Sequence, residues 1–290
     1  MRLNPFNANS VRVRRGGGGG GFPGGGGGKL GCGGLLVVLI GSVIFGVDPG
    51  QMVGMVDGAQ QPAQVQQQTS TGADGAEACY DNDYATETCN ALASLNETWQ
   101  PLFQQAGIPF EQPLLTFIQG GSINTGCGAA TSAMGPFYCP SDKSIYIDVA
   151  FYDQLDRQLG AQGDFARYYV IAHEYGHHVQ TLTGVSDSIR SAQNANRGQA
   201  NQLQVLMELQ ADCYAGVWAG RNRNLIEPGD FEEGMTAASA IGDDTLMRQA
   251  GQVANPESFT HGSSEQRMQA LRLGLESGDD TQCDRIVELR

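Results

Sequence analysis

Two stretches of the chain show the apolar spacing of helices. The first begins at Asp164, a residue that can cap a helix, and runs to about Gln180, with Gly184 as a stop signal. The second, from Leu203 to Trp218, is apolar around much of its circumference, which predicts a buried helix. Over the whole C-terminal half, the pattern predicts helices that begin near residues 164, 199, 231 and 264.

Shorter apolar runs upstream of these helices have the character of strands. Leu114 to Ile118 is one such run, and residues 136–151 alternate on either side of a turn at Pro140 to Lys143, which predicts a β-hairpin. The two kinds of element together predict an α+β domain. An edge strand of its sheet could align an extended peptide by main-chain hydrogen bonds. The alternative is that these strands serve only the core.

A longer apolar run, from Leu30 to Val47, fits neither pattern. Its 18 residues are few for a bilayer span but many for the core of a signal peptide. Basic residues precede the run and Asp48 follows it, which is the positive-inside order. We therefore expect a transmembrane signal anchor, in preference to a cleaved signal peptide. The protein is then predicted to be single-pass in the cell membrane, with its C-terminal domain outside the cytoplasm, in the periplasm or the extracellular space.

The anchor divides the chain into four segments. Residues 1–29 are rich in glycine and are expected to form a disordered cytoplasmic tail. Residues 30–47 form the anchor. Residues 48–75 carry Pro, Gln, Gly, Ser and Thr without periodicity, which indicates a flexible linker. Residues 76–290 are enough for one enzyme domain with its own core.

The cysteines agree with export. Cys32 lies in the predicted anchor, and the other six follow it at spacings that do not resemble a Cys-x-x-Cys zinc set. An even number of thiols outside the reducing cytoplasm favours disulfides. Because loop closure favours sequence neighbours, we predict the pairs Cys79–Cys89 and Cys127–Cys139 and, by elimination, Cys213–Cys283.

The charge distribution separates the two ends of the chain. All 31 acidic residues follow Val47 together with 12 of the 17 basic residues, so the exported part carries a net charge of −19. A surface of this sign repels nucleic acid and anionic lipid headgroups. Nucleic acid is therefore excluded as a partner, and contact with the membrane is expected through residues 30–47. No feature indicates an oligomeric state.

The first predicted helix carries residues that match a catalytic motif. His173, Glu174 and His177 fit the His-Glu-x-x-His pattern of metalloproteases. Residues four apart share a helix face, so His173 and His177 can reach one zinc ion while Glu174 lies beside them as a general base. Zinc held by two imidazoles and one further protein ligand keeps a position open for water. The alternative is an exposed helix with clustered histidines and no metal site.

Two other residues of this helix have different roles. His178 points about 100° away from His177 and is interpreted as a bystander. Gly176 lowers the helix propensity by about 1 kcal/mol relative to alanine. Its presence therefore indicates the close approach of another backbone or of a substrate.

A third ligand must come from another element. Glu208 and Asp212 lie four apart on the second helix, whose apolar flanks make buried carboxylates costly unless a positive group faces them. We predict Glu208 as the metal ligand and Asp212 as the acceptor that holds a ligand imidazole by its other N–H. The alternative is a salt-bridged surface helix with Arg221 and Arg223, which lie beyond i+4 reach of either carboxylate.

These residues resemble the Glu-type zincins, in which His-Glu-x-x-His is followed on a later helix by Glu-x-x-x-Asp. The segments His-Glu-Tyr-Gly-His-His-Val-Gln at 173–180, Glu-Leu-Gln-Ala-Asp-Cys-Tyr-Ala-Gly at 208–216 and Thr-His-Gly-Ser-Ser-Glu-Gln-Arg at 260–267 are similar to the bacterial putative neutral zinc metallopeptidase family. The resemblance implies a membrane-anchored, zincin-like domain with a small sheet packed on the motif helices, Zn²⁺ as cofactor, and a peptide or protein substrate.

That family is similar in turn to membrane-associated zinc proteases with a His-Pro-x-x-x-x-x-Arg-like segment. His261 and Arg267 match its spacing, but Gly262 stands where the relatives have proline. His261 precedes a helix capped by Ser263, where it could donate to the oxyanion of peptide hydrolysis or simply pack on its own helix. Arg267 is expected to tie this loop to Asp212 or Glu208.

The sequence thus predicts a zinc metallopeptidase, an endopeptidase by preference. His173, His177 and Glu208 would bind zinc, Glu174 would be the general base with His261 as a second catalytic residue, and Asp212 and Arg267 would support the ligands. The rival interpretation is a catalytically silent cell-envelope interaction protein on a zincin scaffold. Glu174 favours the enzyme, because a structural zinc site has four protein ligands and no use for a base. A hydrolase of another class, such as an amidase of cell-wall peptides, is a third possibility.

Overall fold

The computed structural model describes residues 1–16, 73–119 and 122–288. Its central sheet has the strand order β1-β2-β6-β5, with β1 (Arg12–Gly16), β2 (Leu114–Ile118) and β6 (Ser144–Ile147) parallel and β5 (Phe137–Cys139) antiparallel to β6. A second sheet pairs β3 (Ser122–Thr125) with β4 (Gly128–Thr131). The predicted strand at 114–118 and the hairpin that follows it are confirmed.

The remaining elements of the described residues are helices. They are α3 (Ala73–Ala76), α4 (Asp83–Ala106), α5 (Ala150–Arg157), α6 (Asp164–Thr183), α7 (Val185–Ala195), α8 (Ala200–Arg221), α9 (Asp230–Ala240), α10 (Asp243–Gln249), α11 (Ser264–Ser277) and α12 (Thr281–Asp284), with short 3-10 turns between some of them. The helices expected near residues 164, 199, 231 and 264 are α6, α8, α9 and α11.

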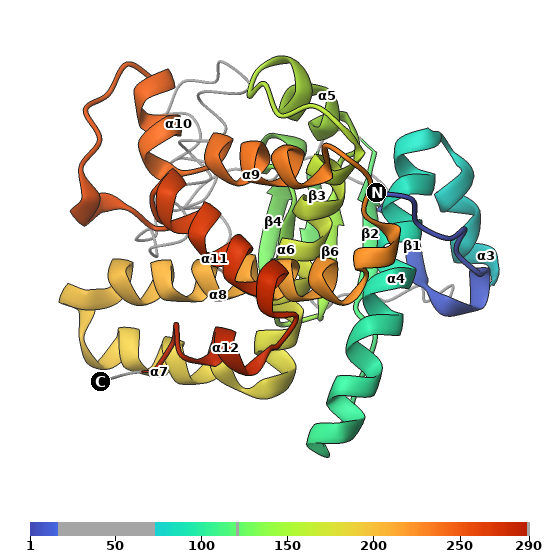
Figure 1. Ribbon diagram of the computed structural model, residues 1–290, viewed down its shortest axis with the longest axis horizontal. Coiled ribbons are helices and arrows are strands. Elements are labelled where there is room, and N and C mark those ends of the chain that lie inside the picture. The colour runs from blue at the N-terminus through green and yellow to red at the C-terminus, as the bar shows by residue number, and fades with distance from the viewer. Residues whose placement is uncertain (17–72, 120–121, 289–290) are drawn as a thin grey trace.

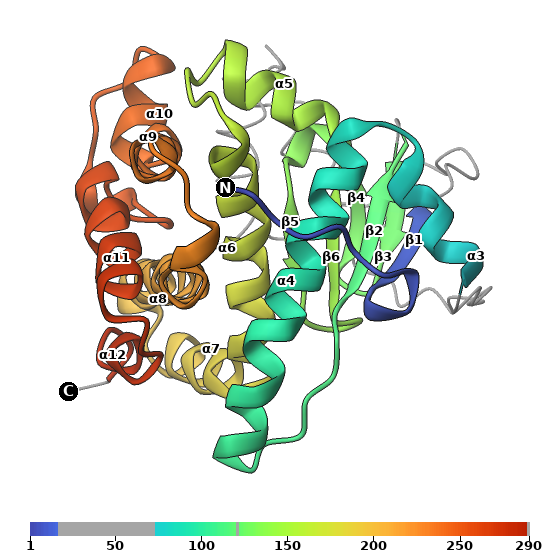
Figure 2. The same cartoon turned by 45° about the vertical axis from the view of Figure 1, so that its right-hand side comes forward.

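The elements form layers (Figures 1 and 2). Helix α6 lies between the sheet on one side and α8 and α9 on the other, and α11 packs on α8. Helix α4 contacts both α6 and α8, and the Trp218 indole of α8 donates to Ser94 Oγ of α4 over 3.0 Å. The core between these layers includes the fully buried side chains of Trp99, Trp218 and Tyr175. Helix α6, which carries the His-Glu-x-x-His residues, is therefore enclosed by other elements on both sides.

The ends of α6 are set by glycines. Gly184, in the left-handed region at φ 80°, ends the helix as predicted. The expected cap by Asp164 is wrong, because Gly163 holds the cap position without a side-chain bond. Glu233 of α9 instead accepts a hydrogen bond from the Phe165 backbone N–H over 3.0 Å. A carboxylate from another helix thus satisfies a backbone donor in the first turn of α6.

The predicted disulfides Cys79–Cys89, Cys127–Cys139 and Cys213–Cys283 are all present. The first ties the start of α4 to the turn before it. The last ties α8, one residue after Asp212, to α12 near the C-terminal end. The metal-motif helix α8 is therefore held by a covalent link as well as by packing.

The expected fold class needs a correction. It placed a transmembrane helix before the domain, but among residues 1–16, 73–119 and 122–288 no helix is both long and apolar enough to cross a bilayer, and a preceding transmembrane helix is not supported. The anchor predicted at residues 30–47 lies outside the described residues, as do residues 17–29 and 48–72 of the predicted tail and linker. The described fold is mixed α and β and mostly helical.

The N-terminal residues also differ from expectation. Residues 1–16 are not a disordered tail: residues 8–10 form a 3-10 turn, β1 joins the sheet, and Phe6, Val11 and Val13 are buried in the main core. The sequence suggested disorder because glycine dominates from residue 16 onward, and the preceding arginines were interpreted as a positive-inside signal. The partners of Arg12, Arg14 and Arg15 lie 66 to 132 residues downstream, so the local sequence does not reveal them.

Candidate metal centre

The candidate site lies where α6 and α8 come closest. A Cβ atom added to Gly176 of α6 would lie 2.8 Å from both Cα and the carbonyl oxygen of Ala211 on α8. Only glycine permits this approach, so the backbone contact expected from Gly176 is present. The contact brings the face of α6 with His173 and His177 against the face of α8 that carries Glu208.

Three potential ligand atoms converge at this crossing. Glu208 Oε2 lies 3.1 Å from His173 Nε2 and 3.4 Å from His177 Nε2. One ligand atom from each of these three residues falls within 4.8 Å of the others. His173 and Glu208 are buried, and His177 is partly exposed. Two imidazoles and one carboxylate, with access to solvent at one of them, suit a zinc ion with an open coordination position.

Hydrogen bonds at the other ring nitrogens fix which atoms face the site. His173 Nδ1 lies 2.8 Å from Asp212 Oδ1, and His177 Nδ1 lies 2.9 Å from Gln180 Oε1. A carboxylate only accepts, so His173 carries a proton on Nδ1, and Nε2, which faces Glu208, is the ring nitrogen that a metal ion would take in exchange for a proton. The Gln180 amide donates to Met207 O over 2.7 Å and to Gln210 Oε1 over 2.9 Å, so its oxygen is the acceptor and His177 has the same tautomer. Both Nε2 atoms therefore face Glu208.

Gln180 was missed as a site residue by the sequence interpretation, which used it only to mark a helix end. It is fully buried and plays for His177 the part that Asp212 plays for His173. A signal was available, because Gln180 follows His177 by three positions on one helix face. Buried polar side chains at such positions need a partner.

We expect Gln180→Leu to lower the zinc affinity about 10- to 100-fold, the usual cost of removing a group that orients a ligand. Leucine fills much of the same space but leaves the His177 ring free to rotate and to change tautomer. Competition with a zinc chelator on the folded protein measures the effect. Gln210→Leu is the matched control, because it removes a partner of Gln180 and leaves the His177 contact. Equal affinities for both variants would show that Gln180 does not orient the ligand.

Asp212 is fixed by a buried network. Arg267 Nε and Nη2 donate to its two carboxylate oxygens over 2.8 and 2.9 Å, and the Tyr169 hydroxyl donates to Oδ1 over 2.6 Å. Both Asp212 and Arg267 are almost fully buried. Burial by itself would raise the pKa of Asp212, but Arg267 and His173 outweigh it and hold that pKa at about 2. The carboxylate is therefore ionised at neutral pH, where it accepts the hydrogen bond from His173 Nδ1.

The charges at the site favour binding of a cation. Burial opposes ionisation of Glu208, but the imidazoles of His261 and His177 hold its pKa well below the usual range. Burial alone would lower the pKa of His173, yet Asp212 and Glu208 raise it to about 9. Without a metal, protons on the imidazoles therefore supply the positive charge that the buried carboxylates need. A bound metal ion would supply it in their place.

Glu174 has the surroundings of a group that exchanges protons. Its side chain is 8% exposed and lies beside His173 and His177 on α6. Burial raises the pKa of its carboxyl, although both imidazoles act in the opposite direction. The raised pKa lies closer to neutral pH, and a group that acts as general base and then as general acid works best when its pKa is near the working pH.

His261 reaches the rim of the site from the loop before α11. Its Nε2 lies 3.9 Å from Glu208 Oε2, and the side chain is 24% exposed. The loop is held by Asp243, whose Oδ2 accepts from the backbone N–H groups of residues 260, 261 and 262 over 2.7, 2.7 and 3.0 Å. The side chain therefore faces Glu208 instead of packing on its own helix.

His178 lies on the other face of α6, away from the ligand atoms. Its Nδ1 is 3.0 Å from the Tyr138 hydroxyl, and its Nε2 is 2.7 Å from the carbonyl oxygen of Glu111. Burial lowers its pKa to about 4, so the ring is neutral. Because a carbonyl only accepts, Nε2 carries the proton. The residue joins α6 to β5 and has no part in the site.

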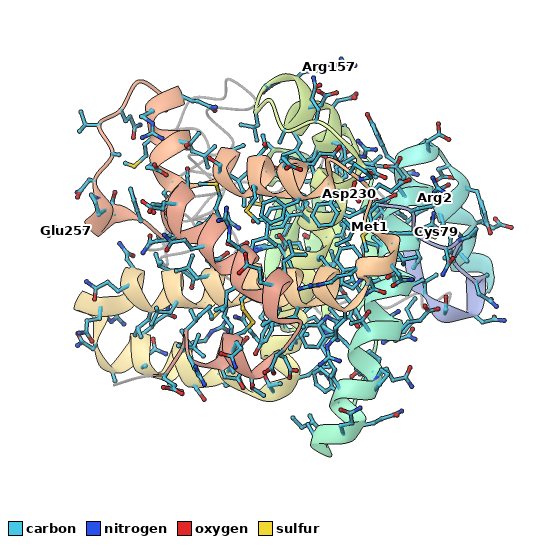
Figure 3. All side chains as sticks on the ribbon, in the orientation of Figure 1. Met1, Arg2, Cys79, Arg157, Asp230 and Glu257 are labelled. Atoms are coloured by element: carbon cyan, nitrogen blue, oxygen red, sulfur yellow. A yellow bond between two sulfur atoms is a disulfide. The ribbon has the colours of Figure 1, made fainter. Side chains whose placement is uncertain are left out.

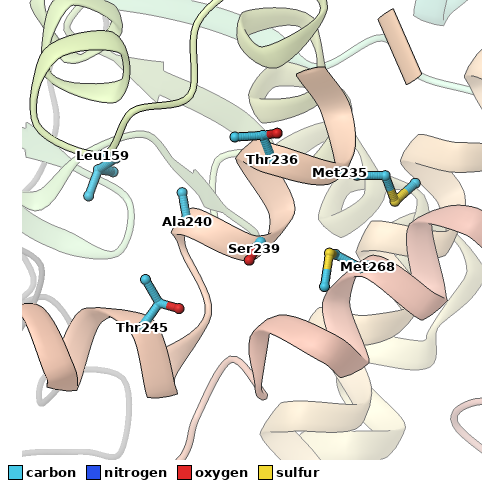
Figure 4. A pocket seen from close by; sticks show the side chains of 7 residues that line it. All are labelled: Leu159, Met235, Thr236, Ser239, Ala240, Thr245 and Met268. Carbon is cyan, nitrogen blue, oxygen red and sulfur yellow. The ribbon is translucent and has the colours of Figure 1, made fainter. Parts of the chain in front are cut away.

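Two other features are poorer candidates for chemistry. A cavity of about 380 Å³ among α5, α9, α10 and α11 is lined by Leu159, Met235, Met268 and small or hydroxyl side chains, without a titratable group (Figure 4). Asp164, Asp230 and Glu233 also lie close enough together to hold a cation. In the structure, however, the Met1 ammonium is 3.0 Å from Asp164 and 2.7 Å from Asp230 (Figure 3). The reactive side chains are concentrated at the crossing of α6 and α8.

Comparison with known proteins agrees with this location. The sequence model of a family described as putative neutral zinc metallopeptidase matches residues 4–286. The uncharacterized protein YpfJ of Escherichia coli K12 is 44% identical over 253 residues, which cover 86% of this chain and 84% of that protein. The uncharacterized protein Rv2575 of Mycobacterium tuberculosis H37Rv is 39% identical over 265 residues, or 84% of each chain. No solved structure gives a significant match.

Proposed function

The chain belongs to the putative neutral zinc metallopeptidase family, and from this premise we propose that it hydrolyses peptide bonds, with His173, His177 and Glu208 as zinc ligands and Glu174 as the general base. The observation that carries the proposal is the convergence of two Nε2 atoms on Glu208 Oε2, within 3.1 and 3.4 Å. The donor set fits zinc: the Nδ1 atom of each imidazole is held by a hydrogen bond, which leaves Nε2 for the metal, and three ligands from the described residues converge.

The side chains around this site divide the work of hydrolysis. When bound, zinc supplies a Lewis acid that polarises a carbonyl group and lowers the pKa of water toward neutrality. Glu174 accepts the proton that water loses as it attacks and delivers it to the leaving amine, a cycle that its raised pKa supports. His261, at the rim, can donate a hydrogen bond to the oxygen on which negative charge develops. Asp212 and Gln180 keep the two imidazoles in place.

The rival interpretation is a cell-envelope interaction protein that keeps the scaffold without the activity. A purely structural zinc site closes its coordination with four protein ligands. Here Glu174, a buried carboxyl beside three candidate ligands, would have no use in such a site. The three disulfides support a location outside the reducing cytoplasm for either function.

The decisive assay uses the full chain, because residues 1–16 are part of the folded domain. A mixed peptide pool is incubated with the zinc-loaded protein, with the chelator-treated protein and with the same sample after zinc is restored. We expect cleavage that is lost and regained with the metal. If the zinc-loaded full chain cleaves nothing while it holds one zinc ion, the scaffold interpretation takes the place of the peptidase.

Glu208→Ala is expected to lower the zinc content sharply from one ion per chain, because two imidazoles alone give only half a coordination shell. Metal analysis after dialysis against a weak chelator measures it. Glu232→Ala, which removes an exposed carboxylate on α9, is the matched control and should keep the full metal content. Unchanged zinc in Glu208→Ala would remove Glu208 from the ligand set.

A further inference from the structure

The N-terminal residues run past α4 before they reach the sheet (Figure 2). Arg2 N–H donates to Leu225 O beyond the end of α8 over 2.7 Å. Phe6 N–H donates to Asn90 Oδ1, and Asn96 Nδ2 donates to Ser10 O, over 2.8 and 2.9 Å, so the segment is fastened along α4. Strand β1 then pairs with β2 in register from Arg12↔Leu114 to Gly16↔Ile118. This path ties the segment to distant elements of one fold.

The fit of the segment is as close as that of a core strand. Phe6, Val11 and Val13 are each less than a tenth exposed and belong to the main hydrophobic cluster. A Cβ atom added to Gly16 would lie 2.5 Å from Ile123 Cδ1 and 3.2 Å from the carbonyl oxygen of Phe117. The last residue of β1 therefore sits where no side chain fits, between β2 and β3.

The arginines of the segment pair with the acidic domain. Arg12 lies 3.3 Å from Glu111, and Arg15 makes a bidentate contact with Asp81 at 2.6 and 2.9 Å. Arg14 donates to Thr116 Oγ1 and to the Tyr146 hydroxyl over 2.9 and 3.0 Å. The basic charges that suggested a cytoplasmic tail thus have their partners on the exported part of the chain. This pairing explains the opposite charges of the two parts without a membrane between them.

The two described elements that flank residues 17–72 lie side by side. Strand β1, which ends at Gly16, contacts α3, which begins at Ala73. A single crossing of a bilayer would separate these ends by a hydrocarbon layer about 30 Å thick. We propose that residues 1–16 are a donor strand of the peptidase domain, bound by its own contacts, and that they lie on the same side of the membrane as the metal centre. This inference does not depend on the proposed catalytic activity.

The first test separates the strand from its covalent link. A site for a specific protease is inserted after Ala59 in the full chain, which carries a C-terminal affinity tag, and the protein is cut in detergent. We expect the N-terminal fragment to stay with the tagged part through native purification and to leave it in denaturant. A fragment that elutes alone after the native cut would overturn the proposal.

Val13→Asp places a charge in the buried face of β1 and is expected to cut retention of the fragment by roughly tenfold or more. Asn9→Asp adds the same charge at an exposed position of the segment and should leave retention unchanged. If Val13→Asp retains the fragment as well as Asn9→Asp does, the strand is not what holds it, and the inference fails.

The second test concerns sidedness and leaves the strand intact. Asn9→Cys on the segment and Asn194→Cys on α7, both exposed positions, are placed separately in a Cys32→Ser background. A membrane-impermeant maleimide is added to vesicles of known orientation. We expect both cysteines to react from the same side. Reaction from opposite sides would restore the single crossing and exclude a shared sheet.

Discussion

Glu174→Gln is expected to lower peptide turnover by about 10²- to 10⁴-fold while the zinc content stays at the wild-type level. Glutamine keeps the shape of the side chain but cannot take a proton from water. Because Glu174 lies outside the ligand set, its replacement leaves both Nε2 atoms and Glu208 in place. Turnover of one peptide and bound zinc are measured on the same preparation, so a loss of metal cannot pass for a loss of catalysis.

Glu265→Gln is the matched control, since it makes the same chemical change at an exposed position on α11. It should cleave at the wild-type rate. A Glu174→Gln variant that cleaves as fast as this control would show that the carboxylate is not the base. A variant that loses zinc instead would mean that Glu174 contributes to the metal site itself.

Arg267→Met is expected to lower the free energy of unfolding by about 3 to 5 kcal/mol, the usual cost of leaving one partner of a buried ion pair without the other. Arg267 is 1% exposed and holds both oxygens of Asp212, which is fully buried. Methionine fills part of the space but donates no hydrogen bond. Urea unfolding at fixed pH, with the disulfides intact, measures the change.

The double variant Asp212→Leu, Arg267→Met separates the two roles of this pair. It removes both charges, so it should regain part of the stability that Arg267→Met loses. It should not regain zinc affinity, because His173 loses the acceptor that fixes its tautomer. If the free energy of unfolding of Arg267→Met lay within about 1 kcal/mol of the wild-type value, Asp212 would have sufficient hydrogen bonds without Arg267.

The sequence was most informative where spacing along one element decides the geometry. His173 and His177 share a face of one helix because they lie four residues apart, with Glu174 next to His173, and the hairpin of β5 and β6 follows from alternation around one turn. Gly176 indicated the close approach of another backbone or of a substrate, but it did not identify α8 or the backbone at Ala211 as the partner. Such a contact depends on tertiary packing, and the local sequence shows only the small residue that permits it.

The features that were missed depend on partners far along the chain. Helix α4 was not predicted, although Asn82 caps it and Gly107 ends it in the left-handed region. The role of Asp243 is visible only when the backbone N–H groups that it binds are in place. In the local sequence, strand β1 is a single valine among arginines. The apolar run at residues 30–47 was interpreted by itself, without the constraint that β1 and α3 lie side by side.

The position of β1 also affects the order in which the chain folds. It is synthesised first, yet the contact of Arg14 with Thr116 spans 102 residues. Parallel pairing over such a separation has a large loop-closure entropy and is intrinsically slow. We expect the helices and the β5–β6 hairpin to form earlier, while the edge of β2 that pairs with β1 is still unpaired. Addition of β1 would then be a late step of folding, and until it occurs the edge of β2 is open to pairing with the β1 strand of another chain.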